Sequence, residues 1–193
     1  MRSVLILSAA QAREIGSAAT AYLRVAPVSS EASAAELVAA MACGPHGIFL
    51  EQAADGGDVA RLAARIAVAE ARHGLPDGCT RIIASTAHDG ASILSLSTFR
   101  AASPRLEGLV FDAATLSSCL GVAEDSEPIR IARALALFAA HAAGAAAVAG
   151  PFASRDPDAI RRAVIEASRQ GYTAALATSL EQAEAIGGDA ARA

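Results

Sequence analysis

The feature that most constrains the fold is a repeated alternation of short apolar runs with longer, alanine-rich amphipathic stretches. The apolar runs are nearly continuous, as in parallel strands covered on both faces. We expect strands at Ser3–Ser8, Ala21–Ala26, Gly47–Glu51, Arg81–Ser85, Leu106–Asp112, Ala145–Ala149 and Tyr172–Ala177. We expect helices between them at Ser33–Cys43, Asp58–His73, Ala91–Ala102, Ile129–Ala143, Asp158–Gln170 and Leu180–Ile186. A strand followed by a helix, repeated about seven times, predicts a parallel α/β fold, either a barrel or an open doubly wound sheet.

The length of the chain favours one domain. Its 193 residues are enough for one core and too few for two ordinary domains, so we expect residues 1–193 to form a single unit with a frayed tail at 187–193. The first strand is followed by Leu7-Ser8-Ala9-Ala10, which lacks the glycines of a dinucleotide-binding turn. The chain also lacks the Gly-x-Ser-x-Gly elbow of serine hydrolases.

Composition excludes further classes of function. The 16 basic residues are all arginine, which excludes Schiff-base chemistry, pyridoxal-phosphate anchoring and the lysine of a phosphate-binding loop. A net charge of −4 and an aromatic content of 4% give no support to nucleic-acid binding. We therefore expect a small molecule or another protein as the partner.

Cysteine usage and hydropathy indicate a cytoplasmic protein that does not enter a membrane. Cys43, Cys79 and Cys119 are odd in number and form no Cys-x-x-Cys pair, so we expect free, buried thiols. Ala134–Ala153 has the length of a membrane span but consists mostly of Ala and Gly. We interpret it as a buried helix end, a stop at Gly144 and a buried strand.

Several short segments, in a fixed order, resemble one known family. They are Leu23–Val25, Gly44–Leu50, Glu70–Pro76, Ala102–Leu109, Gly150–Phe152 and Arg155-Asp156. From Tyr22 onward the chain resembles the citrate lyase β-subunit group of the HpcH/HpaI aldolase superfamily. The resemblance implies a TIM-type (β/α)8 barrel, often trimeric, that cleaves or forms carbon–carbon bonds in CoA thioesters of hydroxy acids. It also implies a Mg²⁺ ion held by one Glu and one Asp, an Arg that grips the substrate carboxylate, and a site at the carboxyl ends of the strands.

The chain departs from this family where the metal should bind. Arg24 stands at the position of the family's substrate-binding Arg. Ser85 stands where the Glu ligand is expected, and Ala114 and Thr115 replace the acidic pair that supplies the Asp. Neutral hydroxyls neutralise none of the charge of Mg²⁺, so no cofactor is predicted.

The chain is also short for the family. The interval between Ser8 and Arg24 lacks room for a strand that the family carries there. We therefore expect a reduced TIM-type barrel of about seven βα units, which must close differently, stay open or borrow from a partner. Unpaired strand edges and an uncovered apolar face then predict self-association.

A relocated metal site is an alternative. Glu51, His88, Asp89 and Asp112 all fall at or just after strand ends, where carboxylate and imidazole ligands would suit Mn²⁺, Zn²⁺ or Fe²⁺. The competing interpretation is that Asp89 and Asp112 cap the helices that follow them. Arg24 likewise either binds a carboxylate or phosphate or forms a salt bridge at the barrel mouth.

Two other groups admit a functional and a structural interpretation. Cys119, near the mouth, is a candidate nucleophile without an assignable base. Four arginines of the late helix could bind a CoA phosphate or could form a solvated face paired with neighbouring acids: Arg155, Arg161, Arg162 and Arg169, with Asp156, Asp158 and Glu166.

These observations leave three functional hypotheses. The first, which we favour, is a divergent, catalytically impaired lyase homologue with a binding or partner role. The second is an active C–C lyase or aldolase acting on an acyl-CoA or 2-oxo acid with a rearranged metal site. The third is a metal-free module that binds a small carboxylic acid or acyl-CoA through Arg24. We expect a homo-oligomer, for example a trimer, or a complex with an active paralogue. Whether the chain is an enzyme stays open.

Overall fold

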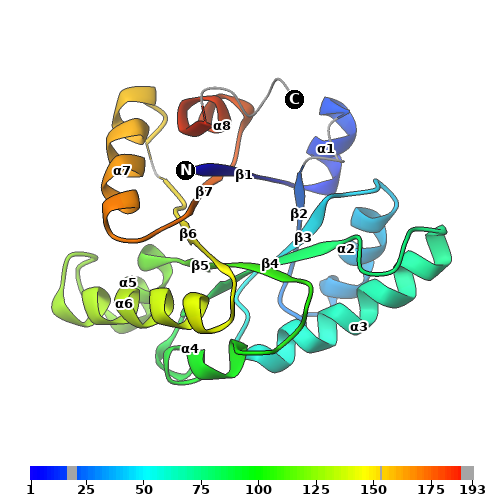
Figure 1. Ribbon diagram of the computed structural model, residues 1–193, viewed down its shortest axis with the longest axis horizontal. Coiled ribbons are helices and arrows are strands. Elements are labelled where there is room, and N and C mark those ends of the chain that lie inside the picture. The colour runs from blue at the N-terminus through cyan, green and yellow to red at the C-terminus, as the bar shows by residue number, and fades with distance from the viewer. Residues whose placement is uncertain (17–20, 153, 188–193) are drawn as a thin grey trace.

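The computed structural model describes residues 1–16, 21–152 and 154–187 and shows a closed barrel of seven parallel strands (Figure 1). The strands are β1 (Arg2–Leu7), β2 (Tyr22–Val25), β3 (Gly47–Leu50), β4 (Arg81–Thr86), β5 (Leu106–Phe111), β6 (Ala146–Ala149) and β7 (Ala174–Ala177). The predicted parallel α/β barrel of about seven units is confirmed. Most of the expected frayed tail, residues 188–193, lies outside the described residues.

The barrel closes by pairing its first strand with its last. Val4 of β1 lies opposite Leu176 of β7, and the strands follow one another around the barrel in sequence order. The short chain therefore closes on seven strands and needs no strand from a partner. A closed barrel has no unpaired strand edges, so the expectation that exposed edges would drive self-association is wrong.

Helices surround the barrel in the expected order. They are α1 (Ala9–Ile15), α2 (Ala32–Met41), α3 (Gly56–His73), α4 (Gly90–Leu94), α5 (Ala113–Leu120), α6 (Glu127–Ala142), α7 (Pro157–Arg169) and α8 (Leu180–Gly187), with a 3-10 turn at Leu96–Phe99. Two of these helices, α1 and α5, were not expected from the sequence. Both carry recognisable end signals: Ser8 and Gln11 form a capping box before Gly16, and Asp112 precedes α5, which ends at Gly121.

The apolar side chains form two layers. One fills the barrel: Val4, Ile6, Tyr22, Phe49, Ile83, Val110, Val148, Ala174 and Leu176. The other lies between the strands and the helices and includes Leu50, Leu62, Ile66, Ile82 and Leu116. Because both faces of each strand are buried, the strands read as continuous apolar runs.

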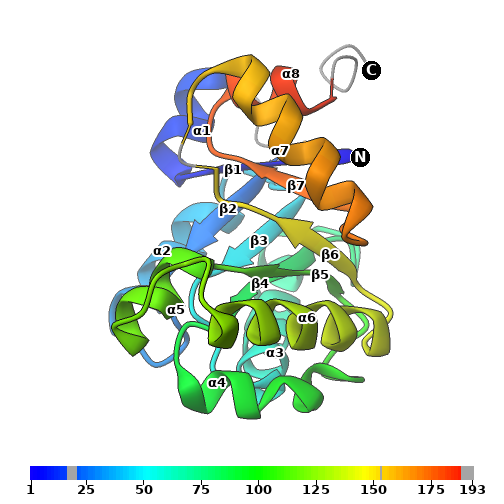
Figure 2. The ribbon, with the colours of Figure 1, turned by 90° about the vertical axis from the view of Figure 1, so that its left-hand side faces the viewer.

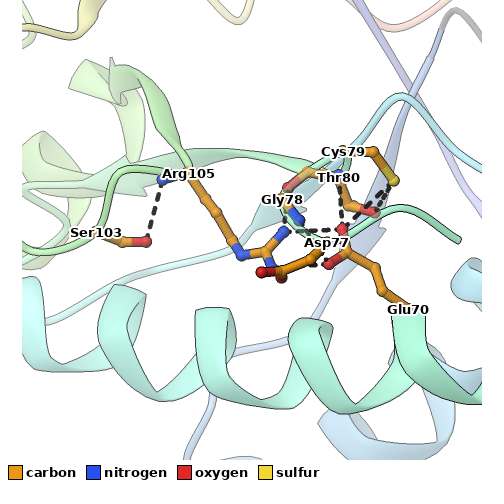
Figure 3. A network of polar contacts seen from close by, with 7 residues as sticks. All are labelled: Glu70, Asp77, Gly78, Cys79, Thr80, Ser103 and Arg105. Atoms are coloured by element: carbon orange, nitrogen blue, oxygen red, sulfur yellow. Dashed lines mark hydrogen bonds and ion pairs between the residues drawn. The ribbon is translucent and has the colours of Figure 1, made fainter.

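A buried ion-pair network joins α3 to the start of β5 (Figure 3). Arg105 donates to both carboxylate oxygens of Glu70, which also accept from the backbone N–H groups of Gly78 and Thr80. Burial favours a higher pKa for Glu70, but the hydrogen bonds from Arg105, Thr80 and Gly78 outweigh it and lower the pKa to about 2. This network anchors the turn between α3 and β4.

All three cysteines are free, but Cys79 and Cys119 are exposed, so the expectation of buried thiols is wrong for them. Cys79 lies in the turn before β4, and Cys119 is on the outer side of α5. Within the described residues, no helix is long and apolar enough to cross a membrane.

Candidate functional site

The pleat of the strands determines which side chains reach the carboxyl end of the barrel. Side chains two residues apart on a strand point to the same face. Counting two residues onward from the interior residues Tyr22, Phe49, Ile83 and Val110 leads to the mouth-lining residues Arg24, Glu51, Ser85 and Asp112. The polar side chains at the carboxyl ends of these strands, or directly after them, therefore converge.

These residues line one cavity of about 270 Å³ at the mouth, which we call the mouth cavity. Its lining residues are Ile6, Arg24, Phe49, Glu51, Gln52, Ser85, Val110, Asp112, Thr115, Pro151, Leu176 and Thr178. Arg24, Ser85 and Thr115, which come from β2, β4 and α5, are thus brought together as the family resemblance implies. Arg24 is the one cationic side chain among the described residues that line this cavity.

Arg24 forms an ion pair within the mouth. Its Nη1 lies 3.2 Å from Oε1 of Glu51, and the two side chains are 48% and 34% exposed. Ion pairs exposed to this degree contribute about 0–1 kcal/mol, because water screens them. Arg24 has five N–H donors, so part of its hydrogen-bonding capacity is free for a ligand.

The donors at the two positions where the resemblance implies metal ligands do not fit a magnesium ion. Ser85 is buried at the end of β4 and offers only a hydroxyl. The Thr115 hydroxyl donates to Oδ2 of Asp112 at 2.8 Å, and the Thr115 backbone N–H donates to Oδ1 at 3.1 Å. Asp112 is thereby engaged as the N-cap of α5. A hard cation prefers charged oxygen ligands, which these positions lack.

The alternative metal site is only half assembled. Glu51 and Asp112 line the mouth cavity, whereas His88 and Asp89 are not among its lining residues. Asp89 caps α4: the Ser92 backbone N–H donates to its carboxylate at 2.7 Å and lowers its pKa. The interpretation of Asp89 and Asp112 as helix caps is confirmed. Across the described ranges, no three His, Cys, Asp or Glu side chains form a group that could hold a metal ion.

Several lining residues were missed as site residues. Gln52 lies directly after Glu51 with a left-handed backbone, at φ 46°, which places it on the wall of the cavity. Such strain in a non-glycine residue is frequent at functional sites. Thr178 follows Leu176 by two residues, so the same count that finds Arg24 also finds it. No local pattern marks the backbone of Gln52.

The other sequence candidates lie outside the mouth cavity. Cys119 is exposed on α5 and does not line it. On α7, Arg161, Arg162 and Arg169 pair with Asp158, Asp156 and Glu166, and all of these side chains are mostly exposed. The interpretation of this helix face as solvated is confirmed for these three arginines.

No family model and no curated protein sequence matches the chain. Several solved structures, however, match its fold. RipC from Yersinia pestis superposes with a TM-score of 0.76 at 23% identity, covering 96% of this chain and 93% of RipC. A citrate lyase from Burkholderia xenovorans LB400 superposes with a TM-score of 0.75 at 18% identity, covering 87% of this chain and 57% of that protein.

A third structure is CitE from Mycobacterium tuberculosis in complex with magnesium and acetoacetate. It gives a TM-score of 0.73 at 16% identity over 96% of this chain and 88% of CitE. The chain spans little more than half of the Burkholderia protein and nearly all of RipC. At these identities the likeness concerns the backbone. The chain therefore has the fold of the HpcH/HpaI aldolase/citrate lyase superfamily, which confirms at the level of fold the resemblance found in its sequence.

Proposed function

We propose that this chain is a divergent, catalytically impaired homologue of the citrate lyase β-subunit. Its barrel mouth binds a small carboxylic acid, free or as an acyl-CoA thioester, through Arg24 and without a metal ion. The observation that carries the proposal is that Arg24, Ser85 and Thr115 line one cavity, with an arginine kept and both metal-ligand positions neutral.

Charge and hydrogen bonding support binding at Arg24. A planar guanidinium matches a carboxylate with two parallel hydrogen bonds. The ion pair between Arg24 and Glu51 is weak, so an incoming carboxylate can share the guanidinium with Glu51 or take the place of Glu51. The class of ligand agrees with structural neighbours, since CitE was captured with magnesium and acetoacetate and a Haloferax volcanii malate synthase with pyruvate and acetyl-CoA.

The oxygen groups that line the mouth cavity and could ligate a metal ion support the proposed loss of lyase chemistry. In this superfamily the metal polarises a 2-oxo acid and stabilises an enolate, so the ion has to be held firmly. Ser85 and Thr115 bring no negative charge to the positions where the resemblance implies metal ligands. Asp112 accepts hydrogen bonds as the N-cap of α5, and the charge of Glu51, the other carboxylate that lines the cavity, is partly offset by Arg24.

Calorimetric titration tests this function. Oxaloacetate, acetoacetate, malonate, glyoxylate and acetyl-CoA are each titrated into the protein in the presence of a chelator. We expect at least one of them to bind, and Arg24→Gln to weaken that binding about tenfold or more, since a charge-assisted pair contributes about 1.5–3 kcal/mol. Arg72→Gln is the matched control, because Arg72 is exposed in the last turn of α3 and does not line the cavity. Binding that survives Arg24→Gln unchanged overturns the proposal.

A second candidate is an active lyase with a rearranged metal site, favoured by the presence of Glu51 and Asp112 in one cavity. It predicts that Mn²⁺ binds in the presence of oxaloacetate and supports cleavage of an acyl-CoA substrate. Asp112→Asn and Glu51→Gln should then abolish both binding and turnover. Absence of Mn²⁺-dependent heat and turnover in the unmodified protein removes this candidate.

We also propose that the chain acts as a single-domain, cytoplasmic protein that associates with itself or with an active paralogue. The exposed apolar side chains of α6 support this: Ile131, Leu135 and Phe138 lie at helical spacing and are 53%, 42% and 67% exposed. Sizing chromatography at micromolar concentration tests self-association, and co-purification with a tagged paralogue tests the alternative. A monomer that captures no paralogue overturns both.

A further inference from the structure

A second hollow opens beside the mouth, between α6 and α7. Both views show β6 lying between these two helices, which stand apart on the outside of the barrel (Figures 1 and 2). The hollow has a volume of about 520 Å³ and lies over the ends of β5 and β6. A volume of this order is typical of small-molecule sites in proteins. We call it the α6/α7 groove.

The α6/α7 groove adjoins the mouth cavity. Asp112 and Pro151 line both hollows, so an extended molecule that passes Pro151 can reach from one into the other. Farther out, the groove adjoins another hollow of about 740 Å³, with which it shares Glu124, Arg133, Gln170 and Tyr172. The path thus runs from Arg24, past Pro151, to Tyr172.

Most of the groove surface is apolar, although four charged residues also line it, and small side chains leave it open: the charged residues are Asp112, Glu124, Arg133 and Glu166. On α7 the lining positions Ala159, Ala163 and Ala167 recur every four residues, so a row of methyl groups faces the groove, with Ile160 and Glu166 beside it. Phe111 and Phe152 supply aromatic surface opposite. Larger residues at the three alanines would fill this space.

Four residues with polar groups line both the groove and the outer hollow, and two of them, Tyr172 and Arg133, bear on ligand recognition. Tyr172 is 8% exposed as a residue, and its hydroxyl, which is not one of the buried unpartnered polar atoms, is accessible from the groove that it lines. Arg133 lies over the ring of Phe111, at 5.7 Å from its centroid. Burial raises the pKa of Tyr172, and the charge of Arg133 offsets part of that rise, so the phenol keeps its proton at neutral pH and can act as a donor.

We propose that the α6/α7 groove receives the apolar body of the carboxylic acid whose carboxylate is bound by Arg24, and that Tyr172 donates to an acceptor on that body. The ligand class is an extended acid with an aliphatic chain that carries a carbonyl or hydroxyl group. This inference rests on the proposed function and adds the length and polarity of the ligand to it.

A chain-length series tests the groove. Acetate, butyrate, hexanoate, octanoate and decanoate are titrated by calorimetry into the protein. Each methylene that enters an apolar groove should tighten binding roughly fourfold until the groove is full. Ala163→Phe should remove this gain and leave the affinity for acetate unchanged. Ser168→Phe, on the exposed side of the same helix, is the matched control. Ala167→Phe serves as a second blocking variant, and thermal unfolding of each variant verifies its fold.

The outcomes separate this inference from the proposed function. If short acids bind through Arg24 but longer chains bring no gain, or if Ala163→Phe and Ala167→Phe leave the gain intact, the groove inference fails alone. If Arg24→Gln leaves the binding of every acid unchanged, or no acid binds at all, the proposed function fails and the groove inference fails with it. Tyr172→Phe should weaken a keto-substituted octanoate several-fold while leaving octanoate unaffected. Equal effects on both acids remove Tyr172 from the recognition.

Discussion

Arg105 grips Glu70 through both terminal nitrogens of its guanidinium, with N–O distances of 2.8 and 2.7 Å. The two side chains are 9% and 1% exposed, and they join α3 to the start of β5 (Figure 3). Both residues belong to segments that carry the family resemblance, Glu70–Pro76 and Ala102–Leu109. These segments therefore include a structural ion pair that lies away from the mouth cavity.

Loss of this ion pair should be costly. Glu70→Gln leaves the Arg105 charge buried with only the exposed Asp77 beside it, and we expect the free energy of unfolding to fall by about 3–5 kcal/mol. Asp77→Asn is the control, because the Asp77 side chain is 93% exposed and should cost less than about 1 kcal/mol. Urea unfolding followed by circular dichroism measures both, and equal losses would contradict the assignment.

The same carboxylate predicts how stability depends on pH. The pKa of Glu70 is lowered from 4.5 to about 2 in the folded protein. The ionised Glu70 carboxylate stabilises the folded protein fully above the pKa that Glu has in the unfolded chain. This stabilisation is lost as the pH falls through the pKa of Glu70 in the folded protein, and the loss between pH 6 and pH 2 amounts to about 3 kcal/mol. Urea unfolding measured at a series of pH values across this range should show that the free energy of unfolding of the unmodified protein falls as the pH is lowered. Glu70→Gln should flatten that part of the curve.

Gly47 should tolerate no side chain. A Cβ at this position would stand 2.5 Å from Cε1 of Tyr22 and 2.6 Å from the carbonyl oxygen of Arg81. We expect Gly47→Ala to destabilise the barrel by about 1–3 kcal/mol through overpacking. Gly90→Ala is the matched control, because nothing lies within 4 Å of its Cβ and the change should be neutral or slightly stabilising. Thermal unfolding compares the two variants.

Glu51 should weaken ligand binding at Arg24. Its carboxylate occupies the same guanidinium at 3.2 Å and repels an incoming anion. Glu51→Gln should therefore tighten the binding of a small carboxylate by about twofold to fivefold, in keeping with the modest worth of an exposed pair. Calorimetry at low salt measures this. Weaker binding in Glu51→Gln would indicate that Glu51 itself holds part of the ligand or a cation.

Much of the fold was predictable because its signals are local. All seven strands appear within a few residues of their expected bounds, since burial on both faces leaves an apolar run that sequence reveals directly. Tyr172 is an instructive exception: it was expected to begin the last strand, but β7 starts at Ala174 and Tyr172 lines the α6/α7 groove. An apolar run shows that a residue is buried, not which element or hollow it faces.

The convergence of Arg24, Ser85 and Thr115 was implied by resemblance, and the structure brings these residues into one cavity. The left-handed backbone at Gln52 and the groove between α6 and α7 gave no sequence signal. The first depends on the geometry of a single turn. The second depends on how far apart two helices stand, which the packing of the whole barrel sets.

The sequence by itself determined the order of strands and helices and the neutral hydroxyls at Ser85 and Thr115, because periodicity and residue identity are properties of each segment. Only the tertiary structure decided that seven strands close into a barrel, with Val4 opposite Leu176, and that a groove lies beside the mouth cavity. Closure depends on the tilt and stagger of all strands together. Closure pairs the first strand, β1, with the last strand, β7, and no pattern within one segment encodes such a pairing.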